Sequence, residues 1–568
     1  MAESPFDRAM ARVSALRRER GTWEPHYREL AKHMLPRRAR WGGRSDLNRG
    51  DRLNDAIINN KPLLAARILA SGLMAGITSP SRIWFRLTTA DPDLADYGPV
   101  RKYLHLSEER LRWAFARSTY YSALADGIYP DISVFGTACG LMEEDAKVGL
   151  RVFTCPVGEY ALAANARGEI DTIGRDRVPM TVRQLVHRFG TKTISTAAKN
   201  AWDRGNYETH IEVAHIIEPN DELDPGKAGP DGMAWSSKWM ELGSDNRTFL
   251  GRGGYEEFPG LTPRWYTRDG DAYGRSPGMD ALGDCKELQF LQRRLANLID
   301  KSADPPMKAS QALQMGRPTL LPGDTTYLPN GQGQVFEPSM VVNPSSIANL
   351  REHIAACEDR INAAFYADLW MYLLNDDRRQ RGTATEVTEA KQETMLQLGP
   401  VLENLNGGLF DPSISRAFAL LDRRGWLPPP PKELAGQELK TEFISVMHQI
   451  QKMTGLVGVR TLVQEIGVLA SLGRSDALDK LNVDQIADEI ASMVGTKPEM
   501  LLSSDEVAQV RQARATRQAA ADNGAAMLAA AKGAKDASQI DPVGLQAVAG
   551  TVAPVAAAQG FPQPGASA

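Results

Sequence analysis

The chain has 568 residues, of which 42% are hydrophobic and 24% charged, an ordinary composition for a protein that buries a core. Its formal net charge of −4 argues against a general nucleic-acid binder, although residues 1–52 carry a local excess of 13 Lys and Arg over 7 Asp and Glu. The four cysteines form no CxxC pair and have no histidine at metal-ligand spacing, so neither a zinc site nor a disulfide framework is expected.

The sequence also lacks the usual signals for a membrane or an export pathway. No stretch of about 18 apolar residues occurs, so no membrane span and no membrane partner are expected. Residues 1–20 have no apolar core of the signal-peptide type. The few cysteines are consistent with a protein made in a reducing cytosol.

The N-terminal half divides into a helical part and a mixed part. Residues 1–76 and 100–128 are predicted to be helical, because apolar residues recur there at helical spacing. From residue 131 to 275, short alternating segments bounded by Gly, Asp and Pro predict strands. One short helix is expected among them, over residues 181–190. This pattern indicates an α+β region.

Two long helices with narrow apolar seams are predicted over residues 277–303 and 345–369. The candidate packing residues of these seams are Leu288, Leu291, Leu295, Leu298, Leu350, Ile354 and Ile361. A narrow seam with polar flanks is typical of helices packed on one another in an array, not of helices buried inside a globule. The segment between them is rich in Pro and Gly and predicts short extended pieces.

A cluster of mixed charge follows the second long helix. It consists of Asp376, Asp377, Arg378, Arg379 and Arg381. Contact with a polyanion is one interpretation, and a solvated loop with internal ion pairs is the other. From these residues alone the solvated loop is favoured.

The next helix is predicted to begin at Thr383, because Thr383 and Glu386 have the spacing of a capping box. Gly399 and Pro400 should kink it near residues 396–400, since proline lacks the amide hydrogen and its ring clashes one turn back. Further helices are predicted over residues 412–424, 437–453, 458–472, 476–493 and 503–521. The last 30 or so residues are expected to be disordered, because they offer little apolar bulk.

Catalytic signatures are absent from the sequence. The motifs GxxxxGK(S/T), GxGxxG, GxSxG and HExxH do not occur in the required contexts. His210 and His215 lie five apart on a predicted strand and should face opposite sides, which disfavours a metal site. We therefore expect no catalytic residue, no cofactor, no metal and no enzyme activity.

Five stretches, in this order along the chain, resemble the portal proteins (head-to-tail connectors) of short-tailed, T7-like bacteriophages. They are SGLMAGITSPSRIWFRL at 71–87, DISVFGTACGLMEED at 131–145, CPVGEYALAANARGEIDTIGRD at 155–176, YGRSPGMDALGDCKELQFLQ at 273–292, and residues 384–421. The resemblance implies a mainly α portal fold with an α+β wing, a two-helix stem, a β-containing clip, a kinked wing helix and a helical crown.

The resemblance also implies a division of the chain. The parts are residues 1–276 as the N-terminal wing region, 277–303 as the first stem helix, 304–344 as the clip, 345–369 as the second stem helix, 370–382 as the channel loop, 383–436 as the kinked wing helix and the following helix, 437–504 as the helical crown, and 505–568 as an Ala-rich, partly disordered tail. The mixed charge of the channel loop suits weak contact with sliding DNA, because strong phosphate neutralisation would create deep binding wells.

The function implied is that of a structural ring, usually of twelve subunits, at one capsid vertex. Such a ring is a conduit for genome packaging and ejection and a docking site for terminase and tail adaptor proteins. The implied partners are other copies of the chain, double-stranded DNA without sequence specificity, terminase, a tail adaptor, and the major capsid and scaffolding proteins. The protein would be made in the host cytoplasm and reside in the virion. The alternatives are a DNA-processing or packaging enzyme, and a monomeric head–tail adaptor.

Overall fold

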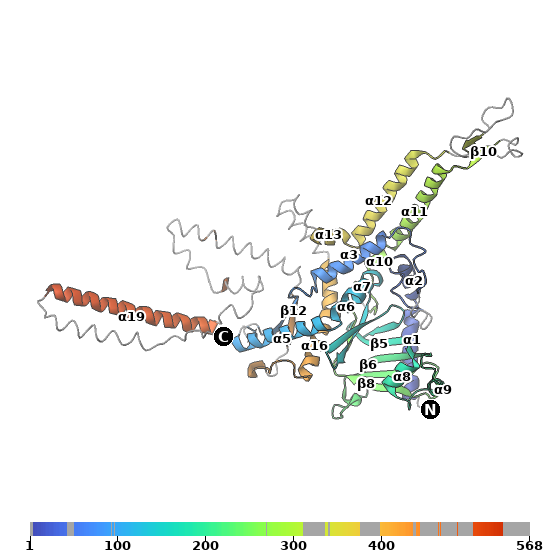
Figure 1. Cartoon of the computed structure of the whole chain (residues 1–568). Helices are drawn as coiled ribbons and strands as arrows, with labels where there is room; N and C mark the ends of the chain where they lie inside the picture. Colours follow the sequence, from blue (N-terminus) through green and yellow to red (C-terminus); the bar gives the residue numbers. More distant parts are fainter. Residues whose placement is uncertain are drawn as a thin grey trace, which may run out of the picture. The chain divides into compact units, whose positions relative to one another are not determined.

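The computed structural model describes residues 4–41, 50–91, 94–95, 97–268, 270–309, 336–338, 341–374, 398–434, 439–443 and 504–537, together with positions 464, 466, 485 and 486. The internal contacts divide the chain into two compact units. One unit combines Met1–Ala90 with Tyr103–Leu481, and the other combines Asp91–Lys102 with Asn482–Ala568. The sheets and most helices belong to the first unit (Figure 1).

A five-stranded antiparallel sheet is the largest sheet of the first unit. Its strands are β4 (Tyr160–Ala164), β5 (Ile170–Thr181), β6 (His210–Pro219), β7 (Trp235–Glu241) and β8 (Phe249–Tyr255). Each strand pairs with the next one along the chain, so the sheet is a meander without crossovers. This confirms the predicted α+β character of the region after residue 131.

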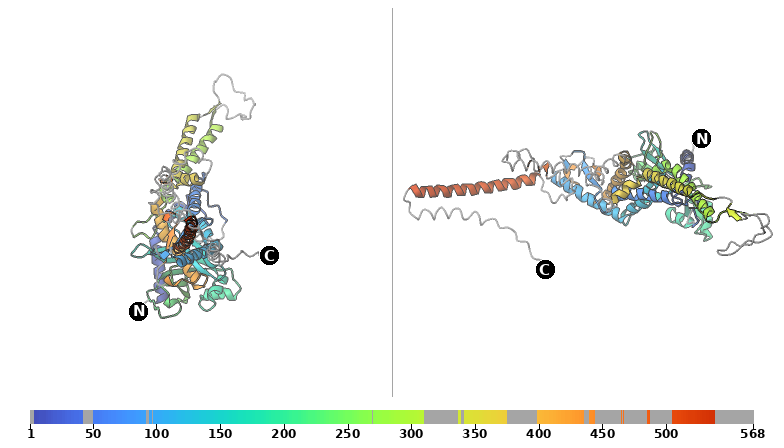
Figure 2. Two further views of the ribbon diagram at one scale, coloured as in Figure 1. Left: turned by 90° about the vertical axis from the view of Figure 1, so that its left-hand side faces the viewer. Right: turned by 90° about the horizontal axis from the view of Figure 1, so that it is seen from above.

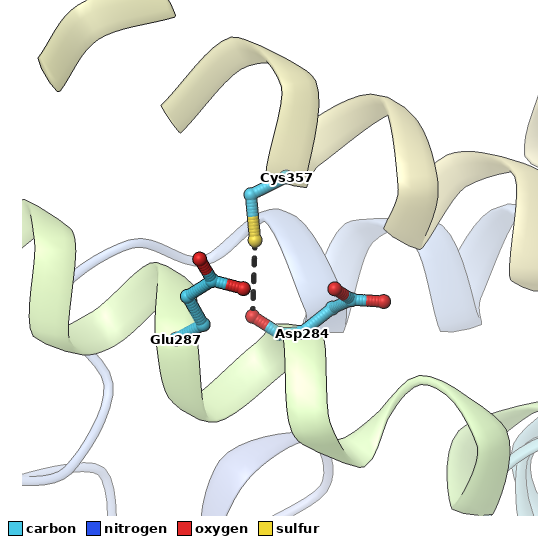
Figure 3. Close-up of side chains that lie close together, drawn as sticks. All are labelled: Asp284, Glu287 and Cys357. Atoms are coloured by element: carbon cyan, nitrogen blue, oxygen red, sulfur yellow. Dashed lines mark hydrogen bonds between the residues drawn. The ribbon is translucent and has the colours of Figure 1, made fainter. Parts of the chain in front are cut away.

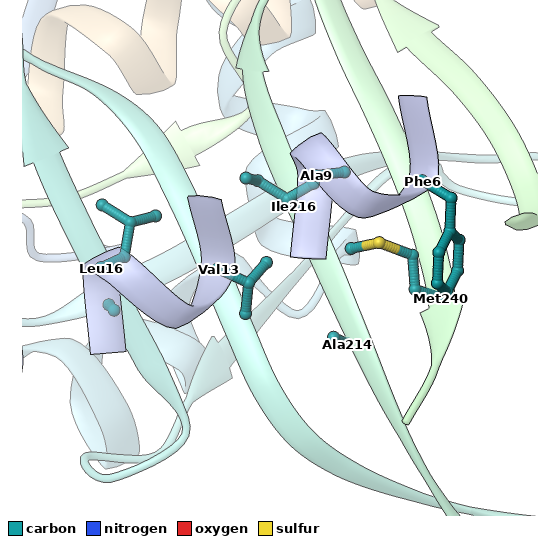
Figure 4. Close-up of a cluster of buried hydrophobic side chains, with 8 residues drawn as sticks. Phe6, Ala9, Val13, Leu16, Ala214, Ile216 and Met240 are labelled. Carbon is teal, nitrogen blue, oxygen red and sulfur yellow. The ribbon is translucent and has the colours of Figure 1, made fainter. Parts of the chain in front are cut away.

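Helix α1 (Pro5–Arg20) crosses one face of this sheet. Its apolar residues recur every three or four positions, so they share one side of the helix. The buried contact consists of Phe6, Ala9, Val13 and Leu16 of the helix and Ala214, Ile216 and Met240 of the sheet (Figure 4). Ser4 caps the helix, since its hydroxyl accepts a hydrogen bond from the Asp7 amide at 3.1 Å.

Helices α8 (Val182–Phe189) and α9 (Thr196–Asp203) cover the other face. Val213 and Trp239 pack against them, because successive residues of a strand point to opposite sides and their neighbours face α1. Helix α8 begins with a capping box formed by Thr181 and Gln184. It confirms the short helix predicted over residues 181–190.

A second sheet has the strand order β3-β2-β9, with β2 (Cys139–Asp145), β3 (Gly149–Cys155) and β9 (Gly260–Leu261). Helices α6 (Tyr120–Ala123) and α16 (Asp411–Arg423) contact it, and α5 (Gly98–Arg117) and α7 (Tyr129–Phe135) flank α6 in the chain. The fully buried Trp84 lies 4.6 Å from Phe85, 6.2 Å from Tyr120 and 5.9 Å from Phe410, measured between ring centroids. Helix α16 confirms the helix predicted over residues 412–424.

Strand β1 (Phe85–Thr89) pairs with β12 (Leu439–Phe443), which comes far later in the chain. The helix predicted over residues 437–453 is therefore wrong at its start. The segment Leu-Lys-Thr-Glu-Phe has its charged residues, Lys440 and Glu442, on one side of an extended chain and Leu439, Thr441 and Phe443 on the other, and it forms a strand once a free edge is available. Strand β1 supplies that edge. The local sequence pattern does not identify β1 as the partner, because β1 lies far away in the chain.

The remaining helices of the first unit are α2 (Glu24–His33), α3 (Lys61–Gly76), α10 (Pro277–Asp280), α11 (Leu282–Ala303), α12 (Pro344–Ala364) and α13 (Ala367–Leu374). The helices predicted over 277–303 and 345–369 are each divided in two. Helix α12 ends at Ala364, and Tyr366, with a φ of 52°, turns the chain into α13. The helical prediction for residues 1–76 is also too broad, since residues 34–41 and 50–60 form turns and irregular chain.

Glycines of α3 make room for α13. A Cβ atom at Gly72 would lie 2.2 Å from Cδ2 of Trp370, and one at Gly76 would lie 2.6 Å from its Cζ3. The indole therefore packs directly on the backbone of α3, an approach that a larger residue would block.

The second unit contains α19 (Ser504–Ala537), a helix of 34 residues. The helix predicted over residues 503–521 is confirmed at its start, but it extends to Ala537 because the Ala-rich sequence has high helix propensity. The predicted disorder falls on the last 30 or so residues, which lie outside the described part. Among the described helices, none combines the length and apolar character needed to cross a membrane.

Candidate functional site: the paired helices α11 and α12

Helices α11 and α12 lie side by side and lead away from the sheets (Figure 1, Figure 2). They are antiparallel, because Arg360 near the end of α12 contacts Asp284 near the start of α11. At the far end, β10 (Met307–Ala309) pairs with β11 (Phe336–Pro338), and residues 310–335 between them lie outside the described part. This places a hairpin-like connection at the tip of the helix pair.

The predicted seam residues differ in their burial. Leu288, Leu295, Ile354 and Ile361 are buried, and Leu291, Leu298 and Leu350 are half-buried. Both helices thus carry buried apolar residues, and the helices pack against each other.

Polar contacts fasten the base of the pair to the rest of the first unit. Gln289 is 5% exposed, and its Oε1 accepts hydrogen bonds from the amides of Ile58 and Asn59 at 2.7 and 2.9 Å. Its Nε2 donates to the Asn59 carbonyl at 2.8 Å. Lys286 pairs with Glu29 of α2 at 2.8 Å. The seam pattern did not identify Gln289, because its partners are backbone groups more than 200 residues away.

Two large apolar side chains of α11 are exposed, and they lie on different sides of the helix because they are nine positions apart. Phe290 is 51% exposed and Ile299 is 41% exposed. The guanidinium carbon of Arg294 lies 4.2 Å from the Phe290 ring centroid, a cation–π contact that covers the ring only in part. Large apolar groups in this position favour a surface that another protein covers.

Three potential metal ligands gather at the base of the pair (Figure 3). Ligand atoms of Asp284, Glu287 and Cys357 lie within 4.8 Å of one another. Arg360 donates to Asp284 Oδ1 at 2.8 Å and to Glu287 Oε2 at 3.0 Å, so it forms an ion pair with both carboxylates. Burial raises the pKa of the Cys357 thiol, which donates to the Asp284 carbonyl oxygen at 3.1 Å. The cluster is therefore explained as an interhelical ion pair, not as a metal centre.

Two buried carboxyl groups have shifted pKa values, a feature that often marks catalytic residues. Burial raises the pKa of Glu108 to about 7, and its Oε1 accepts a hydrogen bond from the Leu87 amide at 2.9 Å. Burial also raises the pKa of Asp131 to about 6, although Arg38 lies 2.7 Å away. Each group thus has a structural partner: Glu108 joins α5 to β1, and Asp131 joins α7 to the segment after α2.

The other predicted site residues are those of the charged loop and of the helix kink. The structure describes the chain up to residue 374 and again from residue 398. Asp376, Asp377, Arg378, Arg379 and Arg381 lie outside the described residues. Gly399 and Pro400 are exposed and belong to a helical stretch over residues 398–405. The chain just before residue 398 is not described, so the kink stays a prediction.

Comparison with known proteins gives the family. The profile of the family described as "Bacteriophage head to tail connecting protein" matches residues 7–501. The chain is 42% identical over 555 residues to the portal protein of Salmonella phage epsilon15, covering 97% of this chain and 99% of that protein. It is 36% identical over 537 residues to the probable portal protein of Bordetella phage BPP-1, covering 94% and 95%.

A solved structure is also similar, at a lower level. A chain in the neck of an empty GTA particle is 14% identical, covers 75% of this chain and 94% of that chain, and has a TM-score of 0.35, which is too low to carry an argument. The near full-length matches confirm the resemblance seen in the sequence. The chain belongs to the family of bacteriophage head-to-tail connecting proteins.

Proposed function

We propose that the chain is a portal subunit, which assembles into a closed ring at one vertex of a phage capsid and connects the head to the tail. The observation that carries this proposal is the similarity to two portal proteins over nearly the whole chain. The ring would be a structural conduit for packaging and ejecting the genome. Twelve subunits are expected from the family resemblance.

The paired helices support the proposal. They bury one narrow seam between them and leave Phe290 and Ile299 exposed on α11. In a ring, the same helices of adjacent subunits would lie next to each other, and each subunit would cover the exposed apolar groups of its neighbour. We assign the stem to residues 277–303 and 345–369 and the clip to residues 304–344 on this basis.

The remaining parts follow in chain order. The wing would comprise residues 1–276 and 383–436, and the crown and tail would comprise residues 437–504 and 505–568. Strand β12 pairs with β1 of the wing, so the first residues assigned to the crown join the wing sheet instead. The loop over 370–382 would face double-stranded DNA in the channel.

The implied partners are those of a head–tail junction. Terminase and a tail adaptor would dock at the clip, and major capsid and scaffolding proteins would contact the wing. Since residues 376–381 combine two Asp with three Arg, contact with DNA should be weak enough to allow sliding. No base readout is needed for such a conduit.

Electron microscopy of the purified chain tests the proposal. Ring-shaped particles with a central hole are expected, and class averages would count the subunits. Compact monomers at every protein concentration would refute the ring and favour a monomeric adaptor.

The competing hypothesis is a DNA-processing or packaging enzyme. Within the described residues, the one grouping of metal-ligand side chains is compensated by Arg360, which disfavours a metal-dependent nuclease. Assays for ATP hydrolysis and for cleavage of double-stranded DNA with Mg²⁺ should show no turnover. Turnover that depends on a residue of this chain would overturn the structural assignment.

A further inference from the structure

A small pocket lies where α1, α2 and β5 meet. Its volume is about 210 Å³, and its lining includes Arg17 and Arg20 at the end of α1, Arg28 of α2, Arg177 of β5 and the indole of Trp41. The apolar side of α1 is already buried on the sheet, so the arginines of its last turns project beside that contact. Three arginines of the basic N-terminal segment thus line one pocket.

Four arginines and three carboxylates line this pocket, and Arg40 and Arg175 pair with one of the carboxylates from outside the lining. Glu24 pairs with Arg20 and Arg28, Asp176 pairs with Arg17 and Arg177, and Glu159 pairs with Arg40 and Arg175, at distances from 2.5 to 3.9 Å. The four guanidinium groups and three carboxylates of the lining leave the pocket a net charge of +1. Ion pairing within the chain does not balance this charge, so an anion is the chemically matched ligand.

Arg20 has hydrogen-bonding capacity left over. The residue is 7% exposed, and its Nη1 donates to the Tyr160 carbonyl at 2.7 Å. Its buried Nε has no hydrogen-bond partner among the residues that the structure describes. A buried N–H group without an acceptor is costly, and an oxygen atom of a ligand in the pocket would remove that cost.

Backbone features hold the pocket in place. Arg177 has a φ of 54°, in the left-handed region, and sits at a bulge where the pairing of β5 with β6 shifts between Arg175 and Val178. A bulge that holds a non-glycine residue in this region directs one side chain at a local energetic cost, a feature often found at binding sites.

A close backbone contact also fixes the position of Trp41 at the pocket. The Arg40 amide donates to the Val157 carbonyl at 2.8 Å, and a Cβ atom at Gly158 would lie 1.9 Å from the Arg40 carbonyl oxygen. Only glycine permits this approach, which seats Trp41 at the pocket. The guanidinium carbon of Arg28 lies 5.0 Å from the Trp41 ring centroid, so the indole orients the arginine.

We propose that this arginine pocket binds a phosphate group, either as free inorganic phosphate or as a backbone phosphate of nucleic acid. The fork of each guanidinium matches tetrahedral phosphate oxygens, and the donors converge on a space suited to one compact anion. An extended acidic peptide would instead need a groove with several separated cations. The proposal goes beyond the conduit role and does not depend on ring assembly, because the pocket lies within one chain.

The test uses the full-length chain in phosphate-free buffer. Titration with inorganic phosphate, followed by ³¹P NMR or calorimetry, probes the free anion, and the fluorescence anisotropy of a short labelled DNA duplex probes the backbone. The double variant Arg28→Gln/Arg177→Gln removes two half-exposed cations from the pocket. The matched control, Arg52→Gln/Arg183→Gln, makes the same charge change at exposed positions that pair with Asp55 and Glu208.

We expect the pocket variant to bind phosphate at least about tenfold more weakly than the control, since it loses charge-assisted hydrogen bonds. If DNA is the source, its affinity falls likewise and the slope of log affinity against log salt decreases by about two. Binding of DNA at other sites of an assembled ring contributes equally to the affinities of the pocket variant and the control, so it cancels when these affinities are compared. If the pocket variant binds inorganic phosphate more weakly than the control but binds DNA equally well, the ligand is the free anion.

The proposal would be overturned if the pocket variant and the control had the same affinity for phosphate and the same affinity for DNA. Competition by polyglutamate as strong as that of phosphate would also overturn it, because this result would assign the pocket to an acidic protein. The unfolding temperatures of the variants show whether the fold is retained. Should the double variant lose stability, Arg17→Gln replaces it, because that side chain is 47% exposed and its ion pair is with Asp176.

Discussion

Truncation of Ile361 to alanine should loosen the helix pair. Ile361 is fully buried near the end of α12, a helix that packs against α11, so the change removes three carbon atoms from a closed contact and leaves a cavity. Such truncations cost about 2–5 kcal/mol, depending on how far the site collapses. Because each 1.4 kcal/mol is a factor of ten in an equilibrium constant, local opening of the pair should become at least about 30-fold more frequent.

Hydrogen exchange measured on peptides from residues 282–303 and 344–364 reports this opening directly. The matched control is Val341→Ala, which shortens a β-branched side chain that is 82% exposed just before α12. The control should change exchange by no more than about two- to threefold, the usual range for exposed sites. An equally small change for Ile361→Ala would refute the conclusion that the seam holds the two helices together.

Three further outcomes are expected. Phe290→Asp should leave the unfolding temperature unchanged but reduce the fraction of subunit rings in electron micrographs, because the phenyl group, which is 51% exposed, would face a neighbouring subunit. An unchanged fraction of subunit rings would show that Phe290 does not lie in the interface between subunits. The stability of the wild-type chain should fall by about 3 kcal/mol between pH 4.5 and 7, because the folded-state pKa of Glu108 is raised from 4.5 to about 7 and the folded chain holds that proton more tightly. The urea midpoints of the wild type and of Glu108→Gln should therefore change with pH at different slopes. Parallel slopes would contradict the assignment of this pKa to Glu108. Replacing Arg378, Arg379 and Arg381 with alanine should preserve rings yet impair DNA packaging or retention, whereas a loss of rings would show that the loop braces adjacent subunits.

The sign of the pH effect follows from the direction of the pKa shift. Below pH 4.5 the Glu108 carboxyl is protonated in both the folded and the unfolded chain, and its contribution to stability is fully present. As the pH rises through 7, the folded chain must hold a buried carboxylate, so that contribution is lost. Arg86 and Arg112 lower the cost in part, because their charges favour the ionised form.

Local pattern predicted much of the helical framework. The helices α8, α11, α12 and α16 were all predicted from local sequence pattern, because that signal depends on residues within a turn or two of each other. The family resemblance was confirmed because it depends on the order of several stretches along the chain. Boundaries were less accurate: Tyr366 breaks one predicted helix, and alanine-rich sequence lengthens α19.

Contacts between distant segments were decided by the tertiary structure alone. Strand β12 forms because β1 offers an edge, Gln289 is buried because the backbone at Ile58 and Asn59 reaches it, and Arg360 turns an acidic cluster into an ion pair. The sequence by itself determined that the N-terminus is basic, that the long helices have one apolar side and that several stretches resemble the family. Only folding gathered the arginines of α1, α2 and β5 around one pocket, because charge composition carries no information about which side chains share a surface.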